Sequence, residues 1–416
     1  MTTTHTTPGL TTPLEGADVK VLLLENIHPD ATDYLRDKGF EVETRAGALS
    51  EDELIEAIRG VHLLGIRSTT YLTERVLAAA PDLLAVGAFC IGTNQIDLPA
   101  ANRHGVAVFN APYSNTRSVV ELAIAEIIAL ARRLHEKNTA MHAGQWDKSA
   151  KGSHEVRGRT LGIVGYGNIG SQLSVVAEAL GMSVVFYDID DKLALGNAKR
   201  CSTIEELLET ADVVSLHVDG RPNNAGLFGD EQMRRMKPRS LFLNLSRGIA
   251  VDTAALRQHI ESGHIAGAAL DVFPIEPKAQ GDPFESDLRG LPNVILTPHV
   301  GGSTEEAQQD IGRFVSSKLR GYLATGTTSL SFTFPELNAP PLTNTHRLAH
   351  VHENHPGMLA EINTIFGDHA VNVEAQHLAT RGGLGYVITD IAAAPSPEVL
   401  GALASIDGTI RLRQIS

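Results

Sequence analysis

The segment Leu161-Gly-Ile-Val-Gly-Tyr-Gly-Asn-Ile-Gly170 decides the fold of the central part of this chain. An apolar run leads directly into the pattern G-x-G-x-x-G. An acid, Asp188, ends the next apolar run, near the ~20-residue distance typical of dinucleotide-binding units. The pattern predicts a strand, a glycine-rich turn and a helix whose N-terminus binds a pyrophosphate.

Each residue of this fingerprint has a distinct physical task. Gly165 permits the tight turn, Gly167 lets a pyrophosphate approach the backbone, and Gly170 lets the helix pack on the sheet. Asp188 can accept both ribose hydroxyls. A 2′-phosphate there would meet this carboxylate and two more acids just behind it, so the sequence favours NAD over NADP.

Composition limits the class of protein. The 416 residues predict about three domains. Hydrophobic residues make up 43% of the chain. The net charge of −14 argues against nucleic-acid or anionic-membrane partners. No apolar run reaches the ~20 residues of a membrane span. Only two cysteines occur, which favours a reducing cytoplasm without disulfides. The Thr-rich residues 1–18 are expected to form a disordered tail.

Alternating patterns predict an α/β protein with two doubly wound, parallel-sheet, Rossmann-like domains. Between them a single long helix is expected over about 116–140, with an apolar face that includes Ile128 and Leu134. Beyond a Pro-containing linker at 331–344, residues 345–416 show a β-α-β-β-α-β order, which predicts a ferredoxin-like module. Its six histidines lack a Cys pair or carboxylate at ligand spacing, so we expect no metal site.

Three polar residues follow apolar strands, where doubly wound sheets place their ligand crevice. They are Arg247, Glu276 and His299. Oxidation of a 2-hydroxy acid needs a base, for which an imidazole is suited, and a cation for the carboxylate, for which a guanidinium is suited. Glu276 could orient the imidazole. Taken singly, the three residues could instead be a surface ion pair, a solvated turn and a loop cap.

Four segments then give a specific resemblance: 165–170, 244–252, 267–277 and 297–302 resemble the signatures of the D-isomer-specific 2-hydroxyacid dehydrogenases. Residues 89–97 and 109–118 further resemble the family members that oxidise 3-phosphoglycerate and carry a C-terminal ACT domain. The resemblance implies that Arg247, Glu276 and His299 are catalytic, with His299 as proton donor and acceptor. It implies NAD contacts from Asn168, Ile169, Asp188, His217, Leu245, Ser246, Asp271, Gly301 and Gly302, with Asp271 on the nicotinamide carboxamide.

The same resemblance implies a domain plan. A discontinuous substrate-binding domain is expected at 19–110 and 303–330, the NAD-binding domain at 111–302, and the ACT regulatory domain at 345–416. The subunits are expected to form a homo-oligomer, a dimer or a tetramer.

The implied activity is NAD-dependent oxidation of 3-phosphoglycerate to 3-phosphohydroxypyruvate, the first step of serine biosynthesis. Candidate substrate residues are Arg67, Ser68, Asn115 and Lys148, the last reaching a neighbouring subunit. Thr69 stands where an Arg is expected, so one cation of the phosphate clamp is missing. Asp219 stands where Pro is usual, near the adenine edge.

L-Serine is the expected effector. His352, Asn354 and Asn372 match the family's serine-binding positions, and a serine would bridge two ACT modules paired edge to edge. The alternative is that these polar side chains merely cap a loop. Two other functions stay open: a dehydrogenase for another 2-hydroxy acid, such as 2-hydroxyglutarate or lactate, and a non-catalytic NAD-sensing protein.

Overall fold

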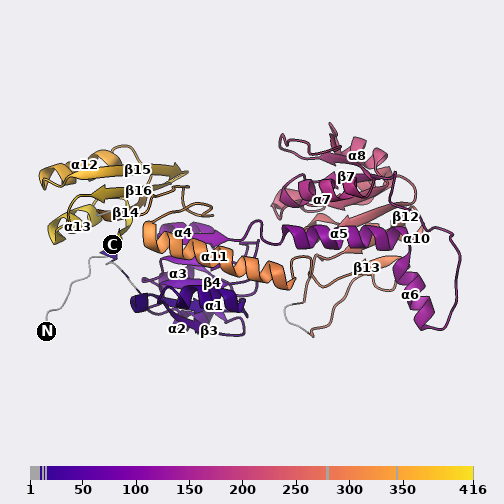
Figure 1. The fold of residues 1–416 in the computed structure, drawn as a ribbon, viewed down its shortest axis with the longest axis horizontal. Coiled ribbons are helices and arrows are strands. Elements are labelled where there is room, and N and C mark those ends of the chain that lie inside the picture. The colour runs from indigo at the N-terminus through magenta and orange to yellow at the C-terminus, as the bar shows by residue number, and fades with distance from the viewer. Residues whose placement is uncertain (1–9, 12–13, 15, 278–280, 343–344, 416) are drawn as a thin grey trace. The chain divides into compact units, whose positions relative to one another are not determined.

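The computed structural model describes residues 10–11, 14, 16–277, 281–342 and 345–415. The chain divides into two compact units, which are described separately below (Figure 1). Unit 1 contains Met1–Ser114 and Gln308–Ser416, and unit 2 contains Asn115–Ala307.

Unit 2 is built on a parallel sheet with the order β9-β8-β7-β10-β11-β12-β13. From β7 the chain adds β8 and β9 on one side, and it then crosses to β10 and adds β11, β12 and β13 on the other side. The topological switch point therefore lies between β7 and β10. Ligands of doubly wound sheets bind at such a point, beyond the carboxyl ends of the strands. The strands are β7 (Thr160–Val164), β8 (Ser183–Tyr187), β9 (Lys199–Arg200), β10 (Val213–Leu216), β11 (Ser240–Asn244), β12 (Ile265–Leu270) and β13 (Val294–Leu296).

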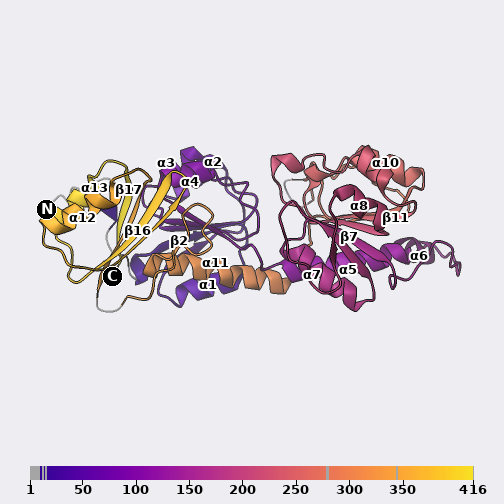
Figure 2. The ribbon, with the colours of Figure 1, turned by 90° about the horizontal axis from the view of Figure 1, so that it is seen from above.

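Helices cover both faces of this sheet (Figure 2). Two of them, α5 and α7, pack on one face, and α8 and α10 on the other. Buried apolar strands between two helical layers are typical of parallel sheets. The helices are α5 (Thr116–Ala131), α6 (Leu134–His142), α7 (Asn168–Ala179), α8 (Ile204–Thr210), α9 (Asp230–Arg235) and α10 (Thr253–Glu261).

The expected long helix over 116–140 is wrong, because the segment forms two helices. Arg133 takes a left-handed conformation (φ +53°) and ends the continuity between α5 and α6. Leu134 is 57% exposed and Ile128 37% exposed, so neither belongs to the buried face predicted for them. No residue of α6 is buried.

Unit 1 begins with a second parallel sheet of order β3-β2-β4-β5-β6. This is the other common doubly wound order. Its strands are β2 (Lys20–Leu23), β3 (Glu41–Thr44), β4 (Leu63–Ile66), β5 (Ala85–Ala88) and β6 (Ala107–Asn110). One face packs on α1 (Pro29–Arg36) and α11 (Glu305–Thr325), the other on α2 (Glu51–Ala57), α3 (Glu74–Ala78) and α4 (Leu98–Arg103) (Figure 2).

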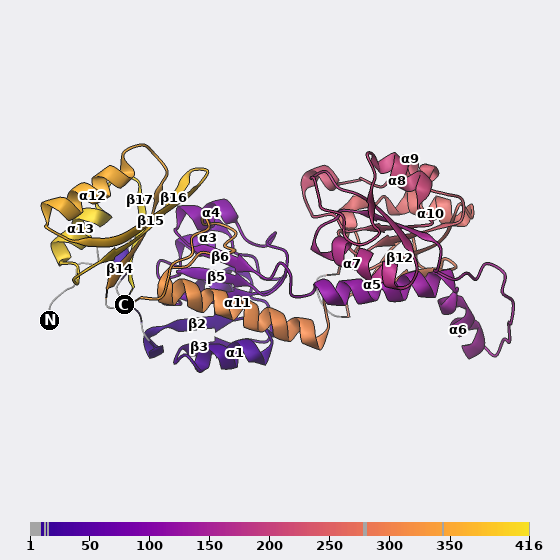
Figure 3. The same ribbon diagram turned by 45° about the horizontal axis from the view of Figure 1, so that its top comes forward.

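A C-terminal sheet completes unit 1, in the order β1-β17-β14-β16-β15. Its four long strands are antiparallel, and α12 (Met358–Asp368) and α13 (Pro397–Ala404) cover one face (Figure 3). The strand–helix order is that of the ferredoxin-like motif, so the predicted fold class is confirmed. The strands are β1 (Leu10–Thr11), β14 (His346–Glu353), β15 (Val373–Arg381), β16 (Leu384–Ile391) and β17 (Thr409–Ile415).

Two segments that the sequence left unstructured are partly ordered. In the expected tail, β1 pairs with β17 and Gly16–Asp18 forms a 3-10 turn, while residues 1–9 lie outside the described residues. In the expected linker, the Thr333 hydroxyl accepts the Val108 backbone N–H, and the Phe334 side chain is buried. Hydrophobic burial and hydrogen bonds to β6 thus order part of the segment 331–344, which its Pro content had indicated to be a linker.

Candidate active site

The glycine-rich turn joins β7 to α7 at the switch point of the sheet. Gly165 has φ +94°, and a Cβ there would lie 2.5 Å from the carbonyl oxygen of His217. A Cβ on Gly170 would lie 2.3 Å from the carbonyl oxygen of Gly165. A Cβ on Gly167 would meet no described atom within 4 Å. The packing of the protein itself therefore requires glycine at 165 and 170. Gly167 has no such packing reason, and it leaves the backbone accessible at the N-terminus of α7, beside Asn168 and Ile169, where a pyrophosphate could bind.

Asp188 lies directly after β8 and beside this turn. One carboxylate oxygen accepts the backbone N–H of Tyr166 at 2.7 Å, and the other accepts that of Asp190 at 2.9 Å. Each oxygen keeps a further lone pair. The half-buried carboxylate is thus held in one orientation and can still accept ribose hydroxyls, which fits the NAD expected from the sequence.

His217 follows β10, the strand on the other side of the switch point. Its Nε2 lies 2.9 Å from the hydroxyl of Ser215, and its buried Nδ1 has no hydrogen-bond partner among the described residues. Burial lowers the pKa of this ring to about 4, so it is neutral at physiological pH. Asp219, expected from the sequence to lie near the adenine edge, pairs with Arg221 at 2.7 Å.

Asn244 organises the chain after β11. Its side-chain oxygen accepts the Ser246 backbone N–H at 3.1 Å and the Ser246 hydroxyl at 2.8 Å, while its amide donates to the Arg247 carbonyl at 3.0 Å. Leu245 is buried within this turn. The next residue, Gly248, permits a close approach, because a Cβ there would lie 2.0 Å from the Phe273 carbonyl. The turn thereby fixes the backbone from which half-buried Arg247 extends.

Asp271 follows β12 and holds the loop 297–301. Its buried carboxylate accepts the Thr297 hydroxyl at 2.6 Å, the Val300 N–H at 2.8 Å and the Gly301 N–H at 2.7 Å. Both oxygens are therefore used inside the protein, a task that the sequence did not predict. One oxygen accepts a single bond and keeps a lone pair for a ligand amide.

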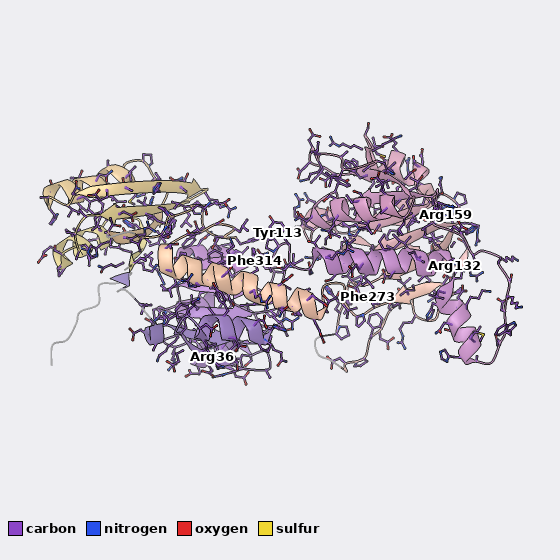
Figure 4. The ribbon with its side chains drawn as sticks, viewed as in Figure 1. Arg36, Tyr113, Arg132, Arg159, Phe273 and Phe314 are labelled. Carbon is purple, nitrogen blue, oxygen red and sulfur yellow. The ribbon has the colours of Figure 1, made fainter. Side chains whose placement is uncertain are left out.

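His299 and Glu276 form the hydrogen-bonded pair expected from the sequence. The Nδ1 of His299 lies 2.9 Å from a carboxylate oxygen of Glu276. The other oxygen of Glu276 accepts the backbone N–H of Phe273 at 3.0 Å, and Phe273 is labelled in Figure 4. The loop presents His299 with φ +55°, a left-handed conformation that is uncommon for residues other than glycine. Such backbone strain is often found at functional sites.

The pair is polarised toward a charged imidazole. The hydrogen bond to Glu276 raises the pKa of His299 above its usual value, burial opposes this, and the negative charges of Glu276 and Asp271 add to it. Burial acts to raise the pKa of Glu276, but the His299 and Phe273 hydrogen bonds outweigh it and hold that pKa low. Arg247 is close enough that its charge lowers the pKa of both groups, so the three residues named from the sequence share one electrostatic site.

Two further polar side chains of this region come from the α5 segment, one beside Gly302 and the other near the charge of Asp271. Asn115 is the N-cap residue of α5, and a Cβ on Gly302 would lie 2.2 Å from its amide nitrogen. The buried amide oxygen of Asn115 has no partner among the described residues. Glu126 lies further along α5, is 3% exposed and has no described hydrogen-bond partner. Burial and the nearby charge of Asp271 raise its pKa to about 8.

The substrate candidates Arg67 and Ser68 lie in unit 1, directly after β4. The buried carboxylate of Glu25 organises their loop by accepting the backbone N–H groups of Arg67, Thr69 and Thr70 at 2.9–3.1 Å. The candidate Lys148 lies in unit 2, is exposed, and has its Nζ 5.9 Å from the ring of Trp146.

The expected effector residues do not converge within one chain. Asn354 donates to the Gly382 carbonyl at 3.0 Å, at one end of β15, whereas Asn372 precedes the other end. Nine strand residues span about 30 Å. His352 is buried on β14, and its Nδ1 lies 2.7 Å from the Glu353 carbonyl oxygen.

Sequence reasoning missed three organising residues: Glu25, Asn244 and Glu126. Glu25 and Asn244 lie at or just after strand ends, which is a usable signal for polar groups near a ligand crevice. Glu126 interrupts the apolar face of α5, and an acidic residue at such a position is a signal for a buried carboxyl group. Within the described part of the chain, no three His, Cys, Asp or Glu side chains are placed to hold a metal ion. The helices there include none long and apolar enough to cross a membrane.

Comparison with known proteins places these features in a family. Residues 124–301 match the model of the D-isomer specific 2-hydroxyacid dehydrogenase NAD binding domain, and residues 348–411 match the AHAS small subunit-like ACT domain. A crystal structure of a Thermus thermophilus protein covers 73% of this chain and 97% of its own, with 32% identity and a TM-score of 0.67. D-Lactate dehydrogenase from Aquifex aeolicus, complexed with NAD and lactic acid, is 25% identical, with a TM-score of 0.63 and coverage of 73% and 95%.

The fold and the site thus define an NAD-dependent oxidoreductase of the D-isomer-specific 2-hydroxyacid dehydrogenase class. Two relatives match it almost from end to end. D-3-Phosphoglycerate dehydrogenase from Haemophilus influenzae is 49% identical over 96% of this chain and 98% of the relative, and the Escherichia coli K12 enzyme of that name has the same values. Within the class, the chain belongs to the D-3-phosphoglycerate dehydrogenase family.

Proposed function

We propose that this protein oxidises 3-phosphoglycerate to 3-phosphohydroxypyruvate with NAD, as the first step of serine biosynthesis. The observation that carries the proposal is the 2.9 Å pair of His299 and Glu276, in a chain 49% identical to D-3-phosphoglycerate dehydrogenases over 96% of its length. When bound, NAD supplies the hydride acceptor. Gly167, Asn168, Ile169 and Asp188 would hold its phosphates and ribose, and His217, Leu245, Ser246, Asp271, Gly301 and Gly302 line the rest of its proposed site.

His299 performs the proton transfer in this proposal. With Nδ1–H donated to Glu276, the free Nε2 of the neutral ring accepts the proton of the substrate C2 hydroxyl. The resulting imidazolium is stabilised by the adjacent carboxylate. In the reverse direction the same nitrogen returns the proton. Arg247 binds the substrate carboxylate through paired N–H donors, which its planar guanidinium provides.

Arg67, Ser68, Asn115 and Lys148 are proposed as substrate residues, with Arg67 and Ser68 on the phosphate. The Glu25 carboxylate supports this part of the proposal, because three backbone hydrogen bonds hold the loop in one conformation. Thr69 supplies no charge to this loop. A substrate without a phosphate is therefore the second candidate, for example lactate or 2-hydroxyglutarate.

L-Serine is the proposed inhibitor, acting between two copies of the chain. β15 is an edge strand of its sheet. Antiparallel pairing of two β15 strands about His377 would bring Asn372 of one copy beside the Gly382 end of the other, where Asn354 lies. A homo-oligomer of at least two subunits is part of this proposal, as is a cytoplasmic location.

One assay separates these possibilities. NADH formation is followed by absorbance with 3-phosphoglycerate, D-lactate and D-2-hydroxyglutarate, each with and without serine. The proposal expects a preference for 3-phosphoglycerate and inhibition by serine. Asn354→Ala should remove serine inhibition and keep most activity, with exposed Asn363→Ala as the matched control. Serine inhibition of Asn354→Ala equal to that of the wild type would contradict the effector site.

A further inference from the structure

The loop that carries Asn354, at the end of β14, is held from two sides. The backbone N–H of Glu353 donates to the Gly408 carbonyl at 2.8 Å, in the turn before β17. The backbone N–H of Asn354 donates to the Gly383 carbonyl at 2.9 Å, in the turn between β15 and β16. The position of the Asn354 side chain, proposed above to bind serine, therefore depends on both turns.

The next residue, His355, adds a side-chain link to one of these turns. Its Nε2 lies 3.3 Å from the Asp407 carbonyl oxygen, and its Nδ1 lies 3.3 Å from the Pro356 carbonyl oxygen. The turn leaves room for the ring, because Gly408 has φ +84° and a Cβ there would lie 2.8 Å from the Nε2 of His355. The imidazole thus joins the effector loop and the start of α12 to the turn before β17.

Both links of this ring require a proton on each nitrogen. A carbonyl oxygen only accepts, and only the imidazolium carries a hydrogen on both Nδ1 and Nε2, so the neutral ring keeps at most one of the two bonds. The bonds to the Pro356 and Asp407 carbonyls raise the pKa of His355 above its usual value, burial opposes this shift, and the negative charges of Glu361 and Asp407 add to it. The full link is therefore present at low pH and is lost as pH rises through this pKa.

His355 is the histidine of this loop that changes charge near neutral pH. Burial lowers the pKa of His350 to about 3, and burial is also the main cause that lowers the pKa of His352, so both of these rings are neutral at pH 7. Asp368 and Glu398 lie at the far ends of α12 and α13. The arginines of β17 donate to carbonyls outside the C-terminal sheet, Arg411 to Leu83 and Arg413 to Tyr322.

We infer that His355 positions the proposed serine site as a proton-controlled clamp, which holds residues 353–356 against the turn at 407–408 and favours serine binding while its ring is protonated. The inference rests on the proposed serine effect at Asn354. Coupling between two ligands is reciprocal, so serine that prefers the clamped loop must in turn favour protonation of His355. Serine should therefore inhibit more strongly at low pH than at high pH.

The test is a calorimetric titration of the full-length protein with L-serine between about pH 6 and pH 8. The dissociation constant of the wild type should rise roughly threefold to tenfold over this range, because one hydrogen bond from a charged ring is lost. In H355Q the dissociation constant should not change with pH. H369Q is the matched control and should follow the wild type, because exposed His369 lies at the other end of α12 and its Nδ1 contacts the Ile365 carbonyl oxygen within that helix.

Proton uptake gives a second readout of the same site. Titrations in buffers of different ionisation enthalpy should show that the wild type takes up part of a proton with serine near neutral pH, whereas H355Q takes up none. Equal pH dependence or equal proton uptake in the wild type and H355Q would overturn the inference. A wild-type affinity that does not change with pH would overturn it as well.

The outcomes separate this inference from the proposals on which it rests. Absence of serine binding at every pH would overturn the inference together with the proposed effector site. Neither result bears on the dehydrogenase proposal, which is tested by NADH formation from 3-phosphoglycerate without serine.

Discussion

The carboxylate of Asp271 accepts the backbone N–H of Val300 at 2.8 Å, so a residue at the end of β12 holds the loop that carries His299. The same carboxylate also binds Thr297 and Gly301. Three hydrogen bonds from one buried side chain fix the loop on both sides of the imidazole. If His299 is the base, as proposed, its positioning depends on Asp271.

Asp271→Asn should loosen this loop. The amide of Asn has one acceptor oxygen where the carboxylate has two, and its NH₂ group would face a backbone N–H donor of the loop. Turnover should therefore fall roughly tenfold or more. The His299–Glu276 pair should also lose order, which NMR of a selectively labelled His299 ring would detect. Turnover and ring signals like those of the wild type would contradict the positioning role. Exposed Asp287→Asn serves as the control.

Glu276→Gln should shift the pH profile of oxidation. In the proposed mechanism oxidation needs neutral His299, so kcat/KM falls as pH drops through the pKa of this ring. The hydrogen bond to Glu276 raises that pKa, and the negative charge of Glu276 adds to the shift. A neutral amide removes the charge, so the acidic limb of kcat/KM should move to lower pH. Turnover should also fall. A limb at the wild-type pH would show that Glu276 does not control this proton, and exposed Glu285→Gln is the control.

Glu126→Gln should stabilise the protein in a pH-dependent way. The pKa of Glu126 is about 8 in the folded chain, well above the ~4.3 of an unfolded one. Between these values the folded state binds the extra proton, so the wild type loses stability as pH rises. Thermal midpoints of variant and wild type should agree near the acidic end and diverge toward pH 8, with the variant higher. A constant difference across this range would exclude a neutral buried carboxyl.

Glu25→Gln should weaken the use of 3-phosphoglycerate more than it slows turnover. The substitution disturbs three backbone hydrogen bonds that shape the Arg67–Thr70 loop, so KM should rise roughly tenfold. Initial rates over a range of 3-phosphoglycerate concentrations check this, with exposed Glu41→Gln as the control. An unchanged KM would remove the positioning role of Glu25.

The fold was predictable because local patterns agreed with the tertiary arrangement. The apolar run and glycines at 161–170 encode strand, turn and helix, and the structure forms β7 and α7 there. The break at Arg133 was not predictable, since helix propensity continues across it and the left-handed backbone reverses only one residue. The pairing of β1 with β17 joins opposite ends of the chain, which no local pattern encodes.

Candidate site residues could be predicted where a sequence motif marks them. They could not be predicted where their role depends on contacts with distant parts of the chain. His299 and Glu276 were named from spacing and resemblance, and they lie 2.9 Å apart. The sequence separates Glu25 from the loop that it holds by two strands and two helices, so its role requires the folded sheet. The partner of Asn372 in serine binding also remains a prediction, because a second copy of the chain must supply it.

The most direct test is the turnover of His299→Ala with 3-phosphoglycerate and NAD, measured as NADH formation beside NAD affinity from calorimetry. The account predicts a loss of roughly 10²–10⁴-fold in kcat, the usual contribution of a general base, with NAD affinity within a few-fold of the wild type. Turnover equal to the wild type with intact NAD binding would contradict the claim that His299 accepts the hydroxyl proton.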